Sequence, residues 1–250
     1  MKKLKVRDIT IGEGRPKIAV PITGENAKEI INQAKRIVEN QPDLIEWRID
    51  FFTDFFAKDK LKKLANDLRK VLGNAVLLIT FRTKKEGGNQ ELSDTNYFKL
   101  YSYVVANELS DLIDVELFHD KTGISKLLQL AHAKGIFVIM SSHDFKKTPA
   151  KSEIITRLHL MAANGADIAK IAVMPQNVAD VLNLLEATYI AHKMLEIPLI
   201  TMSMGDIGKI SRISGQIFGS AVTFGAVGQI SALGQISLAN LKQDIQDLEI

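Results

Sequence analysis

Residues 136–171 contain one full period of the pattern that decides the fold. They comprise the apolar run Ile136–Met140 (IFVIM), a longer helical segment, and a second strand-like run at Ala166–Ile171 (ADIAKI). The same alternation extends through the chain in both directions. In longer segments such as Ala27–Glu39 and Val178–Leu195, apolar residues recur at spacings of three and four, which is typical of amphipathic helices. Strands that alternate with helices indicate βαβ units and a parallel sheet.

Eight strands are predicted on this basis. They are Lys17–Ile22, Leu44–Ile49, Ala75–Phe81, Asp111–Glu116, Ile136–Met140, Ala166–Ile171, Leu199–Met202 and Ala221–Phe224. Eight βα units in 250 residues match the usual length of a (β/α)8 barrel, so we predict an α/β protein with one TIM-barrel catalytic domain over residues 1–250. The alternative is an open, doubly wound sheet. We expect the short segment Leu4–Ile11 to form an N-terminal hairpin that caps the bottom of the barrel.

Composition narrows the classes of function. The net charge is only +3, from 32 basic and 29 acidic residues without a large basic cluster, so we expect no nucleic-acid partner. The absence of cysteine excludes disulfides, thiol nucleophiles and thiolate metal sites. The region from Ile213 to Leu241 is uncharged, but polar residues and glycines interrupt it, so we expect no membrane span. No apolar segment typical of a secretion signal is present, and the cytoplasm is the expected compartment.

Polar residues collect at the ends of the predicted strands, where the active site of such a barrel lies. The second strand ends in Glu46-Trp47-Arg48-Ile49-Asp50. Because residues two apart share a face of a strand, Glu46, Arg48 and Asp50 are expected to point together into the barrel. Buried charges are costly unless they pair or bind a polar group. These residues therefore either form an Arg–carboxylate pair that seals the barrel or belong to a binding site.

The third strand leads into two further candidates. Arg82 lies at the strand end, and a planar guanidinium there suits the binding of an anion or a hydroxyl. Glu86 follows in the next loop. Taken alone, Glu86 is more typical of a solvated loop charge than of a site residue.

His143 and Lys170 carry the clearest chemical signal. His143 directly follows an all-apolar strand, and His is the side chain best suited to take and give a proton near neutral pH. Lys170 lies in an apolar run on the next strand. A lysine that reaches out to solvent is the alternative, but a desolvated lysine near cations has a lowered pKa and a neutral amine that can attack a carbonyl. Adjacent strands would place a base beside a Schiff-base lysine.

The last third of the chain offers candidates for substrate binding. Met202 and Met204 follow the seventh strand and can line a pocket, although methionine is more often a core residue. Arg212 lies in the next helical segment. Ser231 and Gln235 lie in a Gly-containing loop that could close over a ligand.

These candidates belong to a longer series of motifs that occurs in order through almost the whole chain and covers six of the eight strand ends. The series consists of residues 46–50 (EWRID), 80–82 (TFR), 85–88 (KEGG), 142–145 (SHDF), 165–167 (GAD), 170–175 (KIAVMP), 201–204 (TMSM), 219–221 (GSA), 223–226 (TFGA) and 234–236 (GQI). With these motifs the chain closely resembles the type I 3-dehydroquinate dehydratases, which act at the third step of the shikimate pathway in aromatic amino-acid biosynthesis.

The resemblance implies a reaction. Lys170 would condense with the C3 ketone of 3-dehydroquinate, and His143 would remove a C2 proton from the imine. His143 would then protonate the departing C1 hydroxyl, so that a syn elimination of water gives 3-dehydroshikimate. Glu86 would orient His143 and set its basicity. No metal and no organic cofactor are implied, and the family is usually homodimeric.

The resemblance also implies how substrate is held. Arg212 would pair with the substrate carboxylate. Residues expected to hold the ring hydroxyls and keep Lys170 among cations are Glu46, Arg48 and Arg82. The remaining expected contacts are the pocket walls formed by Phe145, Met202 and Met204 and the lid residues Ser231 and Gln235.

Two positions depart from the family pattern. Pro21 stands where some members have Ser, and Leu233 stands where Pro is common in the lid. Neither departure touches Glu86, His143 or Lys170. A class I aldolase-like Schiff-base barrel remains an alternative enzyme, although it would favour a phosphate site. A barrel that only binds a small acid remains an alternative without catalysis.

Overall fold

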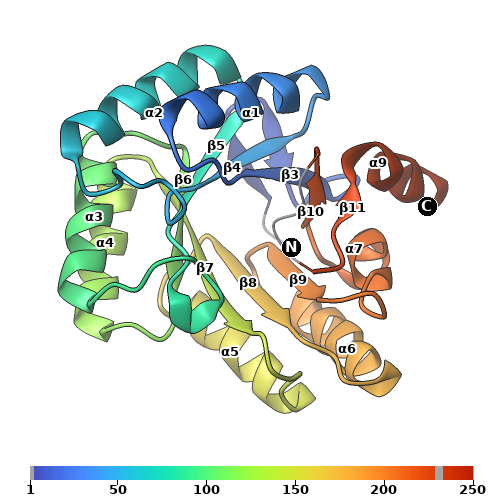
Figure 1. Cartoon of the computed structure of the whole chain (residues 1–250). Coiled ribbons are helices and arrows are strands. Elements are labelled where there is room, and N and C mark those ends of the chain that lie inside the picture. Colours follow the sequence, from blue (N-terminus) through green and yellow to red (C-terminus); the bar gives the residue numbers. More distant parts are fainter. Residues whose placement is uncertain (1–2, 229–232, 250) are drawn as a thin grey trace.

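The computed structural model describes residues 3–228 and 233–249. Parallel strands form its centre, and helices surround them in chain order (Figure 1). The eight central strands are β3 (Lys17–Ile22), β4 (Leu44–Arg48), β5 (Val76–Thr80), β6 (Leu112–Glu116), β7 (Phe137–Asp144), β8 (Ile168–Val173), β9 (Leu199–Ser203) and β10 (Val222–Ala226). All eight predicted strands are therefore confirmed.

The strands close into a ring. Consecutive strands from β3 to β9 pair in parallel, and β10 pairs with β3. A parallel bridge between Leu199 and Ser220 joins β9 to the start of β10, where Ala221 N donates to Leu199 O at 2.7 Å. The short strand β11 (Ile236–Ser237) adds to β10. The closed ring confirms the (β/α)8 barrel and excludes the open doubly wound sheet.

Helices surround the barrel, and the first turns of several are capped by side chains. The helices are α1 (Ala27–Glu39), α2 (Lys58–Leu72), α3 (Asp94–Ala106), α4 (Lys121–Ala133), α5 (Lys151–Ala163), α6 (Val178–Met194), α7 (Ile210–Ile213), α8 (Gly215–Phe218) and α9 (Leu238–Asp247). The side chains of Asn26 and Asn177, for example, accept the N–H of Glu29 and Asp180, which the first turns of α1 and α6 leave unpaired. The helix α1 has its predicted bounds, and α6 ends one residue early.

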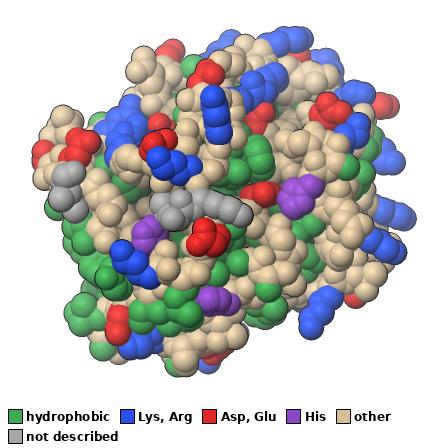
Figure 2. All heavy atoms as spheres, turned by 180° about the vertical axis from the view of Figure 1, so that it is seen from behind, with side chains coloured by type: hydrophobic (Ala, Val, Ile, Leu, Met, Phe, Trp, Pro, Cys, Tyr) green, Lys and Arg blue, Asp and Glu red, His purple; other side chains and the backbone are tan. Residues whose placement is uncertain are grey.

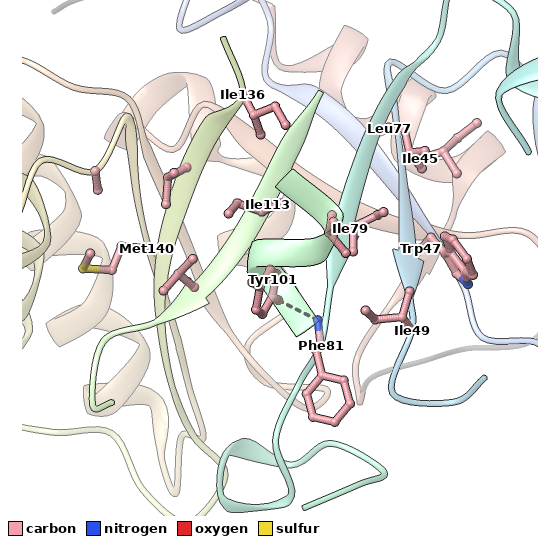
Figure 3. Packing of buried hydrophobic residues seen from close by; sticks show 14 of the residues in the cluster. Ile45, Trp47, Ile49, Leu77, Ile79, Phe81, Tyr101, Ile113, Ile136 and Met140 are labelled. Atoms are coloured by element: carbon pink, nitrogen blue, oxygen red, sulfur yellow. Dashed lines mark hydrogen bonds between the residues drawn. The ribbon is translucent and has the colours of Figure 1, made fainter. Parts of the chain in front are cut away.

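The alternation of side chains along each strand separates two environments. Ile45 and Trp47 on β4, and Ile49 directly after it, are fully buried in the hydrophobic layer between strands and helices (Figure 3). The residues between them, Glu46 and Arg48, face the barrel interior, as the period of two requires. The apolar face thus anchors each strand, and the polar face is left to build a site.

The strand β7 is longer than predicted. We expected it to end at Met140, but it continues to Asp144 because its last residues pair with β8, with Ser141 opposite Lys170 and His143 opposite Ala172. Residues 141–144 are polar, so the apolar pattern of the strand stops at Met140. Their strand conformation comes from pairing with β8. His143 therefore lies on a strand, not in a loop, and its backbone position is fixed by the sheet.

The N-terminal hairpin caps the barrel as predicted. The strands β1 (Leu4–Val6) and β2 (Ile9–Ile11) pair antiparallel. Val6 and Ile11 are buried in one cluster with Leu44 and Leu112, the first residues of β4 and β6. Because these are strand N-termini, the hairpin closes the end of the barrel opposite to the C-terminal strand ends.

The surface seen from behind carries mixed charge. Figure 2 shows Lys and Arg side chains mainly along two sides of this face, with acidic, His and hydrophobic side chains between them. Within the described parts of the chain, no helix is long and apolar enough to cross a membrane.

Candidate active site

A pocket opens at the C-terminal ends of the strands and holds about 610 Å³ of empty space, including its open mouth. Its lining includes eleven of the twelve predicted site residues: Glu46, Arg48, Arg82, Glu86, His143, Phe145, Lys170, Met202, Met204, Arg212 and Gln235. Gly87, Ala172 and Phe224 complete the lining. The twelfth predicted residue, Ser231, lies outside the described residues.

Lys170 lies on β8 with its amine inside the barrel. The residue is only 3% exposed, so it is not a surface lysine. Its Nζ donates to Asp114 Oδ2 at 3.0 Å, lies 3.8 Å from Glu46 Oε1, and sits 4.7 Å from the centre of the Phe224 ring. The nearest charges are thus carboxylates, where we had expected a cationic neighbourhood. The ring and the carboxylates fix the amine at the pocket wall.

Asp114 is a site residue that the sequence analysis missed. It is fully buried on β6, and its Oδ1 accepts from Ser141 Oγ at 2.6 Å and from Arg82 Nη2 at 2.8 Å. Burial acts to raise the pKa of the Asp114 carboxyl, but the charges of Arg82 and Lys170 outweigh it and hold this pKa well below the usual value. Asp114 is therefore a permanent anion between two cations.

Arg82 lies between the carboxylates of two elements. Besides Asp114, its guanidinium contacts Glu116 Oε1 at 2.9 Å and lies 3.6 Å from Glu86 Oε2. Glu116 also accepts from Thr83 N at 2.8 Å and from Thr83 Oγ1 at 2.6 Å. Although burial acts to lower it, the pKa of Arg82 is raised well above the usual value by Asp114 and Glu116. Arg82 therefore stays charged. Its contacts with Asp114 and Glu116 attach the loop that follows β5 to the strand β6.

Glu86 and His143 form a buried pair. Glu86 Oε2 lies 2.9 Å from His143 Nδ1 and accepts from the backbone N–H of His143 at 3.0 Å. Burial, with repulsion from Glu116, raises the pKa of the Glu86 carboxyl to about 8. Burial and the charges of Arg82 and Lys170 lower the pKa of the His143 imidazole well below its usual value. His143 is thus held neutral, with Nδ1 occupied by Glu86.

The predicted cluster on β4 divides into two parts. Arg48 and Asp50 form a two-pronged pair, from Arg48 Nε to Asp50 Oδ1 at 2.7 Å and from Nη2 to Oδ2 at 2.8 Å. Glu46 stays outside this pair, accepting from Thr80 Oγ1 at 2.8 Å and facing Lys170. The predicted Arg–carboxylate pair is therefore present between Arg48 and Asp50, and substrate binding by this motif stays a prediction.

Arg212 is the buried cation outside these networks. It is 1% exposed, and among the described residues no carboxylate lies within ion-pair distance of it. Its Nη2 donates to Leu233 O at 3.0 Å, and its Nε has no partner within the same residues. Burial lowers the pKa of the guanidinium to about 10. A buried charge without a counterion is costly, so this group is set up to receive an anion from the pocket.

Known proteins share both the sequence and this geometry. A model of the type I 3-dehydroquinase family matches residues 18–249. The chain belongs to the type I 3-dehydroquinase family. A 3-dehydroquinate dehydratase from Lactiplantibacillus plantarum is 51% identical over 247 residues, which are 99% of this chain and 98% of the relative.

Solved structures of the family agree with the barrel. The type I 3-dehydroquinate dehydratase from Clostridium difficile, solved with covalently modified comenic acid, has a TM-score of 0.96 and 49% identity, covering 99% of this chain and 98% of that one. A 3-dehydroquinate dehydratase from Geobacillus kaustophilus also has a TM-score of 0.96, at 38% identity, covering 99% of this chain and 96% of that one.

The structure shows where the two departures from the type I 3-dehydroquinase pattern lie. Pro21 is not part of the pocket lining but borders a separate surface depression with Thr23 and Glu29. Leu233 contributes its backbone carbonyl, which accepts from Arg212 and from Gly205 N at 3.3 Å. A backbone carbonyl is available from any residue, so the contact with Arg212 does not require Pro at position 233.

The missed residues left a signal in the sequence. Asp114 and Glu116 are two apart on β6, the same spacing as Glu46 and Arg48 on β4. By the period of two they share the inner face of the barrel. Among the described residues, no group of three His, Asp or Glu side chains is arranged to hold a metal ion. The carboxylates instead bind Arg82 and Lys170.

The raised pKa of Glu86 makes a prediction about stability. In the unfolded chain the carboxyl has its ordinary pKa of 4.5, and in the folded protein about 8. The folded state thus holds this proton more tightly, so the contribution to stability is fully present below pH 4.5 and is lost as the pH rises through about 8. We expect wild type to lose stability relative to Glu86→Gln across this window, by at most about 1.4 kcal/mol per pH unit for one proton.

Denaturant unfolding of both proteins at several pH values measures this difference. The contribution of His143 to stability depends on pH with the opposite sign, because its lowered pKa removes stability as the pH falls. The comparison with Glu86→Gln separates the effect of Glu86 from that of His143. A wild-type-minus-variant difference that stays constant from pH 5 to pH 8 would contradict the raised pKa.

Proposed function

We propose that the protein is a 3-dehydroquinate dehydratase, which removes water from 3-dehydroquinate by syn elimination to give 3-dehydroshikimate. This is a carbon–oxygen lyase reaction and the third step of the shikimate pathway. The observation that carries the proposal is one pocket with three chemically distinct groups: the buried amine of Lys170, the neutral imidazole of His143, and the guanidinium of Arg212, which has no carboxylate partner among the described residues. They match the ketone, the acidic proton and the carboxylate of this substrate.

The covalent step uses Lys170. The Lys170 ammonium gives up one proton so that its amine can add to the C3 carbonyl of the substrate. This proton and one further N–H proton leave with the carbonyl oxygen as water, and an iminium ion remains. The iminium withdraws electrons from C2 and makes a hydrogen there acidic. Asp114 and Glu46, which contact the amine before reaction, provide anions beside the positive charge of the iminium. Hydrolysis of the imine after elimination releases the product and regenerates Lys170.

Proton transfer uses His143. With Nδ1 facing Glu86, Nε2 is the nitrogen left to take the C2 proton. The electrons of the C–H bond move toward the iminium, and the imidazolium returns the proton to the C1 hydroxyl, which leaves as water. One group on one face serves both steps, which is why the elimination is syn. Glu86 orients the imidazole ring through its contact with Nδ1.

Substrate orientation is proposed to start from Arg212, whose planar guanidinium suits a bidentate contact with carboxylate. Arg48, Glu46 and Arg82 line the same pocket and are proposed to bind ring hydroxyls. Phe145, Met202 and Met204 are proposed as the walls, with Gln235 and Ser231 acting from the lid. The mechanism requires no metal and no organic cofactor.

The covalent step is tested by trapping. Purified protein is mixed with 3-dehydroquinate and borohydride, its intact mass is measured, and the modified peptide is mapped. We expect a reduced adduct on Lys170, no adduct at this position in Lys170→Ala, and no measurable turnover in that folded variant. Turnover without an adduct would mean that the lysine is misassigned. Neither turnover nor adduct would favour the aldolase-like or binding-only alternatives.

The proton-transfer step is tested with His143→Ala. General acid–base catalysis contributes about 10²–10⁴-fold, so we expect kcat to fall by a factor in this range. The variant should still form the borohydride-reducible adduct, because Lys170 is intact. Stopped adduct formation, or no binding of substrate, would show that the assignment of His143 is wrong or incomplete.

We further propose that the protein is a cytoplasmic homodimer. Val178, Leu182 and Tyr189 on α6 are 48–65% exposed, and their spacings of four and seven place them on one face of the helix. An exposed apolar stripe of this kind is typical of a protein contact. Light scattering should give twice the chain mass for wild type and a smaller mass for Leu182→Asp. A wild-type monomer at micromolar concentration would refute the dimer.

A further inference from the structure

Asp50 is a fully buried carboxylate that is not part of the pocket lining. It lies two residues beyond the end of β4 and accepts four hydrogen bonds. Two come from Arg48. The other two come from backbone N–H groups, of Arg82 at 3.3 Å to Oδ1 and of Asn89 at 3.0 Å to Oδ2. Both oxygens therefore serve two different parts of the structure at once.

The first of these parts is the side chain of Arg48. The two-pronged contact with Asp50 fixes the plane of the guanidinium, which also lies 4.9 Å from the centre of the Phe51 ring. Arg48 lines the pocket. The direction in which it presents its remaining N–H groups is thus set by Asp50.

The second part is the segment from Arg82 to Gln90, which carries Glu86. Its two ends are held together, since Lys84 N donates to Gln90 O and Gly88 N to Thr83 O, both at 2.8 Å. They approach so closely that a Cβ at Gly88 would lie 1.8 Å from Arg82 O. Asp50 accepts an N–H from each end of this segment. The amide of Asn89 returns a bond to Asp50 O at 3.3 Å.

We propose that Asp50 is a positioning residue that places both Arg48 and the Glu86 segment, and through Glu86 the catalytic His143. The inference rests on the proposed function, because it assigns an effect on dehydration. Asp50 itself touches no substrate. The simpler alternatives are that Asp50 only neutralises Arg48, or that it only stabilises the barrel.

Variants that lack Arg48 distinguish the proposal from these two alternatives. Asp50→Asn in the native protein would leave the Arg48 charge buried and unpaired, so we compare Arg48→Met with Arg48→Met/Asp50→Asn. A neutral amide offers one acceptor oxygen, and the segment then loses one of its two backbone anchors. For both variants, kcat and KM for 3-dehydroquinate and the thermal midpoint are measured.

We expect Arg48→Met to raise KM mainly, through the lost hydroxyl contact. The double variant should have a similar KM, but its kcat should fall at least about ten-fold further, because a shift of about 1 Å at a catalytic group can cost up to a hundred-fold. Equal kcat in the two variants would mean that Asp50 acts through Arg48 alone and would overturn the proposal.

The chain offers a matched control at the other end of the same strand. Asp43 accepts both prongs of Arg15, at 2.8 and 3.0 Å, and the N–H of Ile18 at 2.7 Å. The pair Arg15→Met and Arg15→Met/Asp43→Asn should change the thermal midpoint but leave kcat unchanged. If this control lowers kcat as much as the Asp50 pair does, the effect is general destabilisation and the proposal fails.

Asn89→Ala gives a second test in a protein whose Arg48–Asp50 pair is intact, and it decides the question if the double variant does not fold. It removes the side-chain bond from Asn89 to Asp50 O, which is a third link between Asp50 and the segment, so kcat should fall about three-fold or more with KM unchanged. An unchanged kcat would contradict the proposal. Wild-type protein without any turnover of 3-dehydroquinate would instead refute the proposed function.

Discussion

The contact between the Lys170 amine and the Asp114 carboxylate is the interaction on which the rest of the site depends. Both groups are buried, and a buried charge is costly unless a partner compensates it. Asp114 on β6 is shared with Ser141 on β7 and with Arg82, which follows β5, so the amine is linked to all three neighbouring segments. These links give the charges of Lys170, Asp114 and Arg82 partners and hold the reactive nitrogen in one place.

The ionic network works because the barrel supplies rigidity from outside. The outer residues of the strands, such as Ile45 and Trp47, are packed completely against the helices, so the strands that carry inward-facing charges are held from outside. The hairpin fills the opposite end with Val6 and Ile11. Water is thereby excluded from below, and the charges meet solvent or ligand only through the pocket mouth.

Much of this arrangement could be predicted from residues alone. The period of two placed Glu46, Arg48 and Asp50 on one inner face, and Lys170 between apolar neighbours indicated an interior amine. Asp114 was missed because its segment was treated only as one of the eight predicted strands, and its partner Lys170 lies 56 residues away in the chain. The position of His143 on a strand also depended on pairing with β8. Contacts between distant segments leave no local pattern in the sequence.

The balance of charge explains why Glu86 differs from the other carboxylates. Among the described residues, the buried acidic side chains are Glu46, Asp50, Glu86, Asp114 and Glu116, and the buried cations are Arg48, Arg82, Lys170 and Arg212. Arg212 has no carboxylate partner among these residues, so the other three cations face all five carboxylates. Burial and repulsion from Glu116 raise the pKa of Glu86 to about 8, whereas Arg82 and Lys170 hold the pKa of Asp114 below its usual value. Because Arg212 lies outside the network, an anion can bind there without taking a partner from Lys170.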